Sequence, residues 1–350
     1  MASSHCLSEE SDSGVGGTSN TNSHSVDYEN GDLDLDCSAD KINQFPEALV
    51  LEILRYLPVK ERCIAGRVCK RWRRIVSDNS LWRHVDLLQY RLDLPRMWKV
   101  LRAHFSPCLL TMKVKGFAHA ASRKRKKMSV SDSMMKELSF RCPNLTVLHL
   151  HDCNTENLSF DSLPCSITSL SITSSSWTPR WFKDKHDHLP SMHTLNLTST
   201  IRLDRFDLED IALMSGLKKL SLCGCYRVRG SDIEVVAKKL VNLESLNLSS
   251  TNIDDLGIHH ITHNLVNLRE LFLDSCEVIS DASLASIGVC LTKLYMLDIS
   301  HADKVTMEGL KALFRLDKLK FVTFVREKKL TQEELQSFKK GFLQRITVVG

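Results

Sequence analysis

The sequence predicts an α/β protein in which a small all-helical domain precedes a solenoid, with a parallel sheet on the concave side and helices on the convex side. Three observations support this fold class. The polar composition of residues 1–40 changes abruptly near Ile42, two short helical patterns follow, and an apolar repeat then runs to the C-terminus. We therefore expect a tail at 1–40, a helical domain at 41–85 and a repeat domain at 86–350.

The tail is acidic and polar. Residues 1–40 contain nine Asp and Glu residues and no Lys or Arg, whereas the whole chain carries a net charge of +5. With so few large apolar side chains, this segment cannot offset its ordering entropy, and we expect it to be disordered. The first 30 residues show no signal-peptide pattern, and no run of 18 apolar residues occurs. We therefore expect no membrane partner and a cytoplasmic and/or nuclear location.

Residues 45–82 predict two helices. Pro46 can occupy a first helical turn, and Pro58 ends the pattern that follows it. The apolar positions at helical spacing between them are Leu49, Ile53, Leu54 and Leu57. A second helix is predicted from about Lys60, with Ile64, Val68 and Trp72 on one stripe. About 40 residues is close to the lower limit for independent folding. The apolar surface exceeds what these helices can hide, which indicates docking against another protein.

The repeat has an apolar-x-x-apolar-x-apolar pattern followed by a small residue, as in Leu145, Leu148, Leu150 and Cys153. First positions fall at 145, 167, 192, 217, 243, 268, 294 and 319, and weaker copies begin at Trp82, Leu109 and Leu343. This period and pattern are typical of a leucine-rich repeat. We expect a strand and a helix in every repeat, the helix opened in one case by a capping box at Ser231-x-x-Glu234.

Strand alternation predicts which side chains face the concave surface. The fourth and sixth residues of each repeat point into the core, so the third, fifth and seventh point outward. The outward residues that we predict to contact a protein substrate are His149, His151, Glu270, Phe272, Asp274 and Phe321. The two phenylalanines either anchor a partner or lie under a neighbouring tail or loop, and the sequence leaves both readings open.

A basic insertion near 118–130 separates two early repeats and contains five consecutive basic residues at 123–127. This run is consistent with a nuclear-import signal, a contact for an acidic partner, or a solvated loop. It lacks the interleaved aromatic residues that stack on bases, so we expect no nucleic-acid partner.

The cysteines at the small-residue position indicate a structural role. Cys153, Cys225 and Cys276 can each bond backbone groups at the bend that follows a strand. A disulfide between Cys225 and Cys276 is implausible, because these residues lie two repeats apart, about 10 Å by strand spacing, and a bridge needs Cα atoms within about 7 Å.

Metal and catalytic sites find no support in the sequence. Cys223-x-Cys225 lacks a second pair, and His259 and His263 lack a third ligand, so we expect no metal and no cofactor. There is no Walker loop, nucleophile elbow or Gly-x-Gly-x-x-Gly after a strand. We therefore expect no catalytic residues and a chain that is not an enzyme.

The segment 45–82 resembles an F-box. The residues that carry the resemblance are Phe45-Pro46-Glu47, Val68-Cys69-Lys70-Arg71-Trp72 and Leu81-Trp82. Phe45 replaces the Leu of the usual Leu-Pro start. With the repeats, residues 42–350 are similar to the F-box/LRR-repeat family. The resemblance implies that the F-box binds the Skp-type adaptor of an SCF (Skp–cullin–F-box) ubiquitin ligase, and through it cullin and RING subunits. The adaptor-binding residues that it implies are Phe45, Pro46, Leu49, Ile53, Leu54, Leu57, Val68, Cys69 and Trp72.

The resemblance also implies a function. The chain would be the substrate-recognition subunit of an SCF-type ligase, with its repeats binding a target protein for ubiquitination and proteasomal degradation. The alternative is a non-degradative scaffold that binds the adaptor without promoting ubiquitin transfer.

Overall fold

The computed structural model describes residues 41–118, 128–156, 158–325, 332–342 and 347–349. The predicted tail at 1–40 and the basic run at 123–127 lie outside the described residues. The chain divides into two compact units between Leu81 and Trp82. We call them the helical unit and the repeat unit and describe each by itself. The structure assigns Trp82–Val85 to the repeat unit, whereas the predicted helical domain extended to residue 85.

The helical unit is built from short helices, and Pro46, Pro58 and Cys69 precede the second, third and fourth of them. They are α1 (Lys41–Gln44), α2 (Glu47–Arg55), α3 (Val59–Ala65) and α4 (Lys70–Val76), followed by the 3₁₀ turn η2 (Asn79–Trp82) at the boundary. The single helix predicted from Lys60 through Trp72 is wrong. Cys69 is extended at φ −154°, and its Sγ accepts the Trp72 backbone N–H at 3.4 Å, so a new helix starts there.

The Arg62 side chain in α3 links separate parts of the helical unit by hydrogen bonds. Its half-buried guanidinium donates hydrogen bonds to the carbonyl oxygens of Leu54 at 3.2 Å and Arg55 at 2.9 Å, and also to that of Leu81. Burial lowers the pKa of Arg62 from its ordinary value. These bonds tie the C-terminal end of α2 to α3 and to Leu81, and they give the Leu54 carbonyl oxygen a second donor besides the Leu57 N–H. The small core beneath them contains Val50, Leu54, Val59, Ala65, Ile75, Val76 and Leu81.

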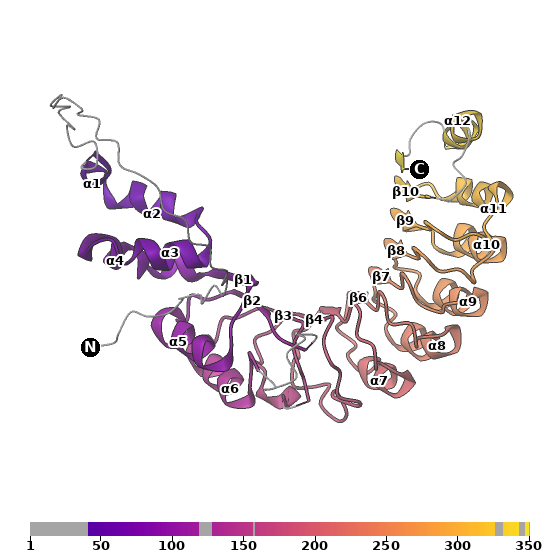
Figure 1. Cartoon of the computed structure of the whole chain (residues 1–350). Coiled ribbons are helices and arrows are strands. Elements are labelled where there is room, and N and C mark those ends of the chain that lie inside the picture. The colour runs from indigo at the N-terminus through magenta and orange to yellow at the C-terminus, as the bar shows by residue number, and fades with distance from the viewer. Residues whose placement is uncertain (1–40, 119–127, 157, 326–331, 343–346, 350) are drawn as a thin grey trace, which may run out of the picture. The chain divides into compact units, whose positions relative to one another are not determined.

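The repeat unit contains one parallel sheet whose described strands follow chain order from β1 to β11 (Figure 1). They are β1 (His84–Arg91), β2 (Thr111–Lys115), β3 (Val147–His151), β4 (Ser169–Thr173), β5 (Thr194–Asn196), β6 (Lys219–Ser221), β7 (Ser245–Asn247), β8 (Glu270–Phe272), β9 (Met296–Asp298), β10 (Phe321–Thr323) and β11 (Thr347–Val349). The predicted solenoid is confirmed, and the three weaker copies of the repeat each contribute a strand.

Helices cover the outer side of this sheet in most repeats (Figure 1). They are α5 (Leu94–His104), α6 (Asp132–Arg141), α7 (Arg205–Ile211), α8 (Gly230–Lys239), α9 (Asp255–Asn264), α10 (Asp281–Cys290), α11 (Met307–Lys311), η4 (Ala312–Arg315) and α12 (Gln332–Gly341). The predicted helix in every repeat is wrong for two of them. Only the 3₁₀ turn η3 (Phe160–Ser162) lies between β3 and β4, and turns alone connect β4 to β5.

An aromatic cluster replaces the missing helices. Phe160, Trp177, Trp181 and Phe182 are buried, and their ring centroids lie 5.0–5.6 Å apart in tilted or edge-to-face pairs. The Trp181 indole N–H donates to the Leu158 carbonyl oxygen at 2.5 Å. Such rings bury large areas in few residues, so they fill the volume that a helix would occupy.

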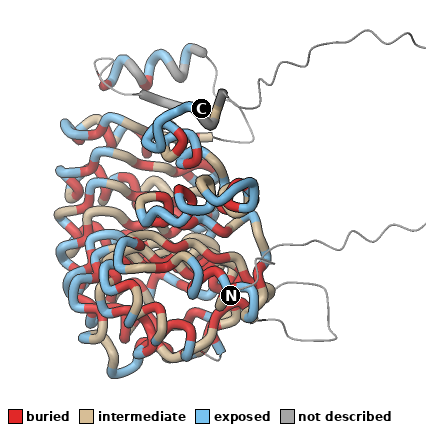
Figure 2. Tube along the Cα trace, turned by 90° about the vertical axis from the view of Figure 1, so that its left-hand side faces the viewer, coloured by how far each residue is buried: buried red, intermediate tan, exposed pale blue. Residues whose placement is uncertain are grey.

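The strand residues alternate as predicted. Along β7, Leu246 at the fourth position is fully buried, whereas Ser245 and Asn247 on either side are half-buried. Figure 2 shows the buried residues recurring in every coil of the repeat unit. The predicted capping box at Ser231 is wrong, because α8 begins at Gly230 and the Asp232 carboxylate accepts the Arg229 backbone N–H at 3.0 Å.

The bend that follows strands β3 to β9 is built in the same way. The residue before the small position has positive φ, between 48° and 72°, at Asp152, Ser174, Ser199, Gly224, Ser250, Ser275 and His301. Small residues with a thiol or hydroxyl then donate to a backbone carbonyl oxygen, and at Cys225 and Cys276 that carbonyl belongs to the previous repeat. The Cys225 thiol donates to the Leu197 carbonyl oxygen and the Cys276 thiol to that of Leu248, both at 3.2 Å. The predicted structural role of these cysteines is confirmed.

Candidate partner-binding surfaces

Helix α2 presents apolar side chains on two faces. Val50 and Leu54 share the inner face and are each 1% exposed, whereas Leu49 and Ile53 share the outer face at 52% and 46%. Leu54 was predicted to bind the adaptor, but the helical turn that pairs it with Val50 places it in the core. Leu54 therefore supports the surface from beneath and does not form part of it.

The other residues predicted on this surface are exposed or half-buried. Phe45, Pro46, Val68 and Cys69 are exposed, whereas Leu57 and Trp72 are half-buried. Tyr56 is also exposed, at 81%, and the prediction missed it. The helical spacing from Leu49 through Ile53 to Tyr56 is the signal that could have found it. We call Phe45, Leu49, Ile53, Tyr56 and Val68 the apolar stripe of the helical unit.

Charged contacts hold α2 against α4 beside this stripe. The Glu47 carboxylate pairs with Arg74 and lies 3.8 Å from the Arg71 guanidinium. Arg71 also donates to the Phe45 carbonyl oxygen, which fixes the chain that enters α2. The apolar stripe is therefore displayed on helices that are tied to each other.

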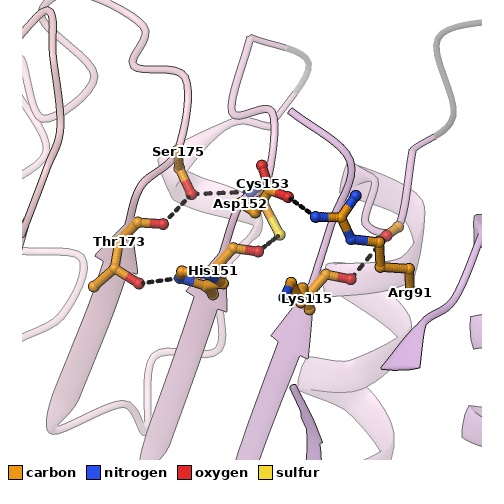
Figure 3. Close-up of polar contacts among 8 residues, drawn as sticks. Arg91, Lys115, His151, Asp152, Cys153, Thr173 and Ser175 are labelled. Carbon is orange, nitrogen blue, oxygen red and sulfur yellow. Dashed lines mark hydrogen bonds and ion pairs between the residues drawn. The ribbon is translucent and has the colours of Figure 1, made fainter. Parts of the chain in front are cut away.

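The first part of the concave surface carries histidines bonded to one hydroxyl. His149 Nε2 and His151 Nδ1 each lie 2.9 Å from Thr173 Oγ1 (Figure 3 shows the His151 contact). Burial lowers the pKa of His149, and the nearby charges of His151 and Lys113 add to that effect. His149 is therefore neutral at pH 7 and offers hydrogen bonds, not charge, to a partner.

An ion pair lies next to these histidines at the end of the strands. Arg91 donates to the Asp152 carboxylate at 3.0 Å, and Ser175 accepts the Cys153 backbone N–H at 3.0 Å (Figure 3). The Lys113 ammonium pairs with Asp86 at 3.0 Å on the same sheet face. The charges on this part of the surface are therefore largely compensated internally.

The second part of the concave surface lies on β8 to β10. Glu270 and Phe272 are half-buried on β8, and Asp274 follows them and bonds the His301 ring at 2.8 Å. That hydrogen bond raises the pKa of His301. Phe321 on β10 packs edge-on against Tyr295, with centroids 5.2 Å apart. Among the described residues no tail covers these rings fully, so both phenylalanines remain half-exposed to a partner.

The predicted substrate residues therefore form two groups. His149 and His151 lie on β3, whereas the other four lie on or just after β8 and β10. Five strand spacings separate β3 from β8, about 24 Å along the sheet. One small ligand cannot reach both groups, but an extended protein surface can.

Metal-binding clusters and membrane-spanning helices are both absent from the described residues. Among the described residues no group of three His, Cys, Asp or Glu side chains could hold a metal ion. His259 and His263 stack on α9 with centroids 3.9 Å apart. No described helix has both the length and the apolar character needed to span a bilayer.

Comparison with known proteins assigns the family. Residues 42–88 match the F-box-like family model. F-box/LRR-repeat protein 12 of Bos taurus is 32% identical over 235 residues, which cover 65% of this chain and 70% of that protein. The F-box/LRR-repeat protein 12 of Homo sapiens is 31% identical over 237 residues, which cover 66% of this chain and 71% of that protein. The chain belongs to the F-box/LRR-repeat family. The helical unit is thus the F-box of this family member, and the sheet is its leucine-rich-repeat solenoid.

A solved structure supports the fold of this F-box/LRR-repeat protein. A chain from the crystal structure of the Rad7 and Elc1 complex in yeast aligns over 89% of this chain and 90% of its own length, with a TM-score of 0.51. The identity is only 13%, so this likeness concerns the architecture.

Proposed function

We propose that this F-box/LRR-repeat protein is the substrate-recognition subunit of an SCF-type ubiquitin ligase. Its F-box would bind a Skp-type adaptor, and through it cullin and RING subunits, while the solenoid binds a target protein. The observation that carries the proposal is the apolar stripe, which a 41-residue helical unit leaves exposed although its core is already formed. Exposed apolar stripes on small domains are docking surfaces.

The stripe can contribute measurably to a specific contact. Full burial of a Leu or Ile side chain is worth about 1.5–3 kcal/mol, and Leu49 and Ile53 are 52% and 46% exposed, so burying what remains contributes about 1.5–3 kcal/mol together. That range corresponds to a factor of about 10 to 10² in affinity. The yeast Rad7 and Elc1 complex supports the proposal, because a protein of this fold is there joined to another chain.

The chain itself would perform no bond chemistry. We propose that it accelerates ubiquitin transfer by proximity, holding a target lysine near a charged enzyme supplied by other subunits. The target would lie on the concave surface, against His149 and His151 or against Phe272 and Phe321. The same proposal places the protein in the cytoplasm and/or the nucleus.

Co-purification tests the adaptor contact. The Leu49→Asp/Ile53→Asp variant of the full chain should lose Skp-type adaptor and cullin, which the unmodified chain recovers. Leu256→Asp is the matched control, because Leu256 is 53% exposed on α9 of the repeat unit. It should recover both partners. Retention of adaptor by the double variant would contradict the proposal.

Target levels separate the receptor from the scaffold alternative. If the chain is a receptor, a protein bound by the repeats should accumulate and lose its ubiquitin chains when Leu49→Asp/Ile53→Asp replaces the unmodified chain. Unchanged levels of that protein would favour the scaffold.

A further inference from the structure

The strand-entry edge of the repeat unit carries a row of side chains that the proposed function does not use. The row consists of the residue immediately before each of strands β5 to β10. Its members are His193, Lys218, Glu244, Arg269, Tyr295 and Lys320. We call these six positions the edge row. Apart from half-buried Glu244, all of them are exposed.

Backbone hydrogen bonds fix the pitch of the edge row. The Lys218 carbonyl oxygen accepts the N–H groups of Glu244 and Ser245 at 2.8 and 3.0 Å. The Arg269 carbonyl oxygen accepts those of Tyr295 and Met296 at 2.7 and 2.9 Å. The carbonyl oxygens of His193, Glu244 and Tyr295 each likewise accept two N–H groups from the next repeat. Successive side chains are therefore held one strand spacing apart, about 4.8 Å.

Two adjoining hollows lie along this row. One has a volume of about 400 Å³ and lies among Lys218, Glu244, Arg269 and Lys293. The other, of about 390 Å³, lies among Arg269, Lys293, Tyr295 and Lys318. Because both share Arg269 and Lys293, they form one continuous depression, which we call the edge groove.

Cationic charge in the edge groove exceeds what its own carboxylates neutralise. The only carboxylates among the described residues that line it are Glu244 and Glu270, against four Lys and Arg side chains. Lys218 lies 3.5 Å from Glu244, and Lys293 donates at 2.6 Å to the neutral amide of Asn267. In the described part of the chain no carboxylate forms an ion pair with Arg269 or Lys318. These cations are free to bind an anion.

We propose that the edge groove binds an extended, carboxylate-rich segment of a partner protein. In an extended segment alternate side chains point the same way and repeat every 6.6–6.8 Å or so. Lys218 and Arg269 lie two strand spacings apart in the edge row, about 9.6 Å, and Lys293 and Lys318 lie two residues before Tyr295 and Lys320. The long Lys and Arg side chains can span the differences between these positions and the carboxylates of the segment. Arg269 can hold one carboxylate with two parallel hydrogen bonds. Tyr295, 39% exposed, gives an apolar residue of the segment a ring to pack against.

The elongated shape of the edge groove also favours a protein segment as the occupant. The edge groove follows the stacking direction of the strands, and Tyr295 lines it with a ring that packs against Phe321. It is therefore a short track for one extended chain with mixed acidic and apolar side chains. This inference does not depend on adaptor binding, because the groove lies wholly within the repeat unit.

Fluorescence anisotropy with the full-length chain tests the proposal. The probe is a labelled dodecapeptide of alternating Glu and Ser with one central Leu. The Arg269→Glu/Lys293→Glu/Lys318→Glu variant should weaken its binding by about tenfold or more, as expected for loss of several charge-assisted bonds. The matched control is Arg202→Glu/Arg227→Glu/Lys304→Glu, which makes the same charge change in exposed turns after strands. It should change binding by less than about threefold.

Five further outcomes decide the proposal. Equal weakening by both triple variants would overturn it as a mere charge effect. Unchanged binding of a peptide with Gln for Glu would overturn it by showing that the carboxylates are not recognised. Tighter binding of a single-stranded oligonucleotide of equal charge would assign the groove to nucleic acid instead. Binding of a phosphoserine peptide more than about tenfold tighter would overturn the carboxylate assignment. Should the triple variant unfold, Arg269→Gln/Lys318→Gln must still weaken the peptide, and unchanged binding would refute the groove.

Discussion

The repeat unit carries two different outer layers on one sheet. Residues 152–193, which we call the aromatic segment, cover the sheet with turns, η3 and the aromatic cluster. Residues 204–315, the helical segment, cover it with α7 to α11. The strands stay in the same register through both, since Leu148 pairs with Leu170, Leu170 with Leu195 and Leu195 with Leu220. The strand leucines thus set the pitch, and the outer layer needs only to bury enough apolar volume.

Removing the central ring of the aromatic cluster should have the largest effect. Phe160 is fully buried between Trp181, Phe182 and His188. Phe160→Ala should cost about 3–5 kcal/mol of unfolding free energy, because it removes a large side chain and leaves a cavity. Urea unfolding followed by near-ultraviolet circular dichroism measures this. Ile258→Ala in α9 is the counterpart, with an expected cost of about 2–5 kcal/mol. A loss below about 1 kcal/mol for Phe160→Ala would show that the cluster is not a substitute core.

Two carboxylates of the helical segment, Asp207 in α7 and Asp255 in α9, should contribute opposite pH dependence to stability. Burial raises the pKa of Asp207 to about 6, against weaker opposing hydrogen bonds from the backbone of Asp204 and Arg180. Its neutral form therefore stabilises the fold below about pH 4. That contribution, about 3 kcal/mol at most, is lost as the pH rises through about 6. Relative to Asp207→Asn, the wild-type chain should lose stability between about pH 4 and pH 7.

Asp255 supplies the contrast within the same segment. Burial alone would raise its pKa, but hydrogen bonds from Ser280 and Ser283 outweigh that effect and lower it. Its stabilising contribution is therefore present above the unfolded-state pKa and lost as the pH falls through the lower folded-state value. Urea midpoints of wild type, Asp207→Asn and Asp255→Asn from about pH 2 to about pH 7 check both signs. Parallel curves for the two variants would contradict the argument.

A close helix contact should make the helical segment sensitive to one methyl group. A Cβ added at Gly257 in α9 would lie 2.6 Å from the Gly230 Cα in α8. Gly257→Ala should therefore cost about 1–3 kcal/mol by overpacking, although alanine is the better helix former. Thermal and urea unfolding measure the change. Gly66→Ala, where the new Cβ would approach no atom closer than 3.4 Å, should be nearly neutral. An increase in stability for Gly257→Ala would show that the helices can move apart freely.

The smallest expected effect concerns the bend after the strand. Ser250 has φ of 55°, the conformation that Gly224 adopts at the equivalent position of the preceding repeat. Ser250→Gly should change the unfolding free energy by less than about 1 kcal/mol, in the stabilising direction, because glycine meets no Cβ clash there. Ala285→Gly, at an exposed site within α10, should instead cost about 1 kcal/mol. Destabilisation by both substitutions would show that the bend does not require positive φ.

Regular apolar spacing explains what the sequence could predict. Leu246 and Leu248, like their counterparts in other repeats, are buried because period-two alternation in a parallel sheet admits no other arrangement. The turn position of Cys225 and Cys276 followed from the same register. The apolar stripe could likewise be predicted, because Leu49 and Ile53 lie one helical turn apart.

Other features depend on contacts that no local pattern encodes. The break between α3 and α4 requires the extended backbone of Cys69, which a helical stripe does not reveal. The aromatic segment has no helical periodicity in its sequence. The contacts among its rings therefore become apparent only in the folded structure. Leu54 faces inward because α2 has a second apolar residue, Val50, that selects the inner side. The edge row lies outside the repeat pattern, at positions where polarity varies from strand to strand.

The buried thiols at the bends have a chemical consequence. Burial raises the pKa of Cys153 and Cys225 to about 12 and that of Cys276 to about 11, so almost no thiolate exists near neutrality. Because the thiolate is the nucleophile, alkylating reagents and peroxide should bypass these three sulfurs. Exposed Cys69 lies in the helical unit, beside exposed Val68. The rate at which Cys69 is alkylated should therefore fall when a partner covers this part of the F-box. The native thiol serves as the probe, so no cysteine has to be introduced.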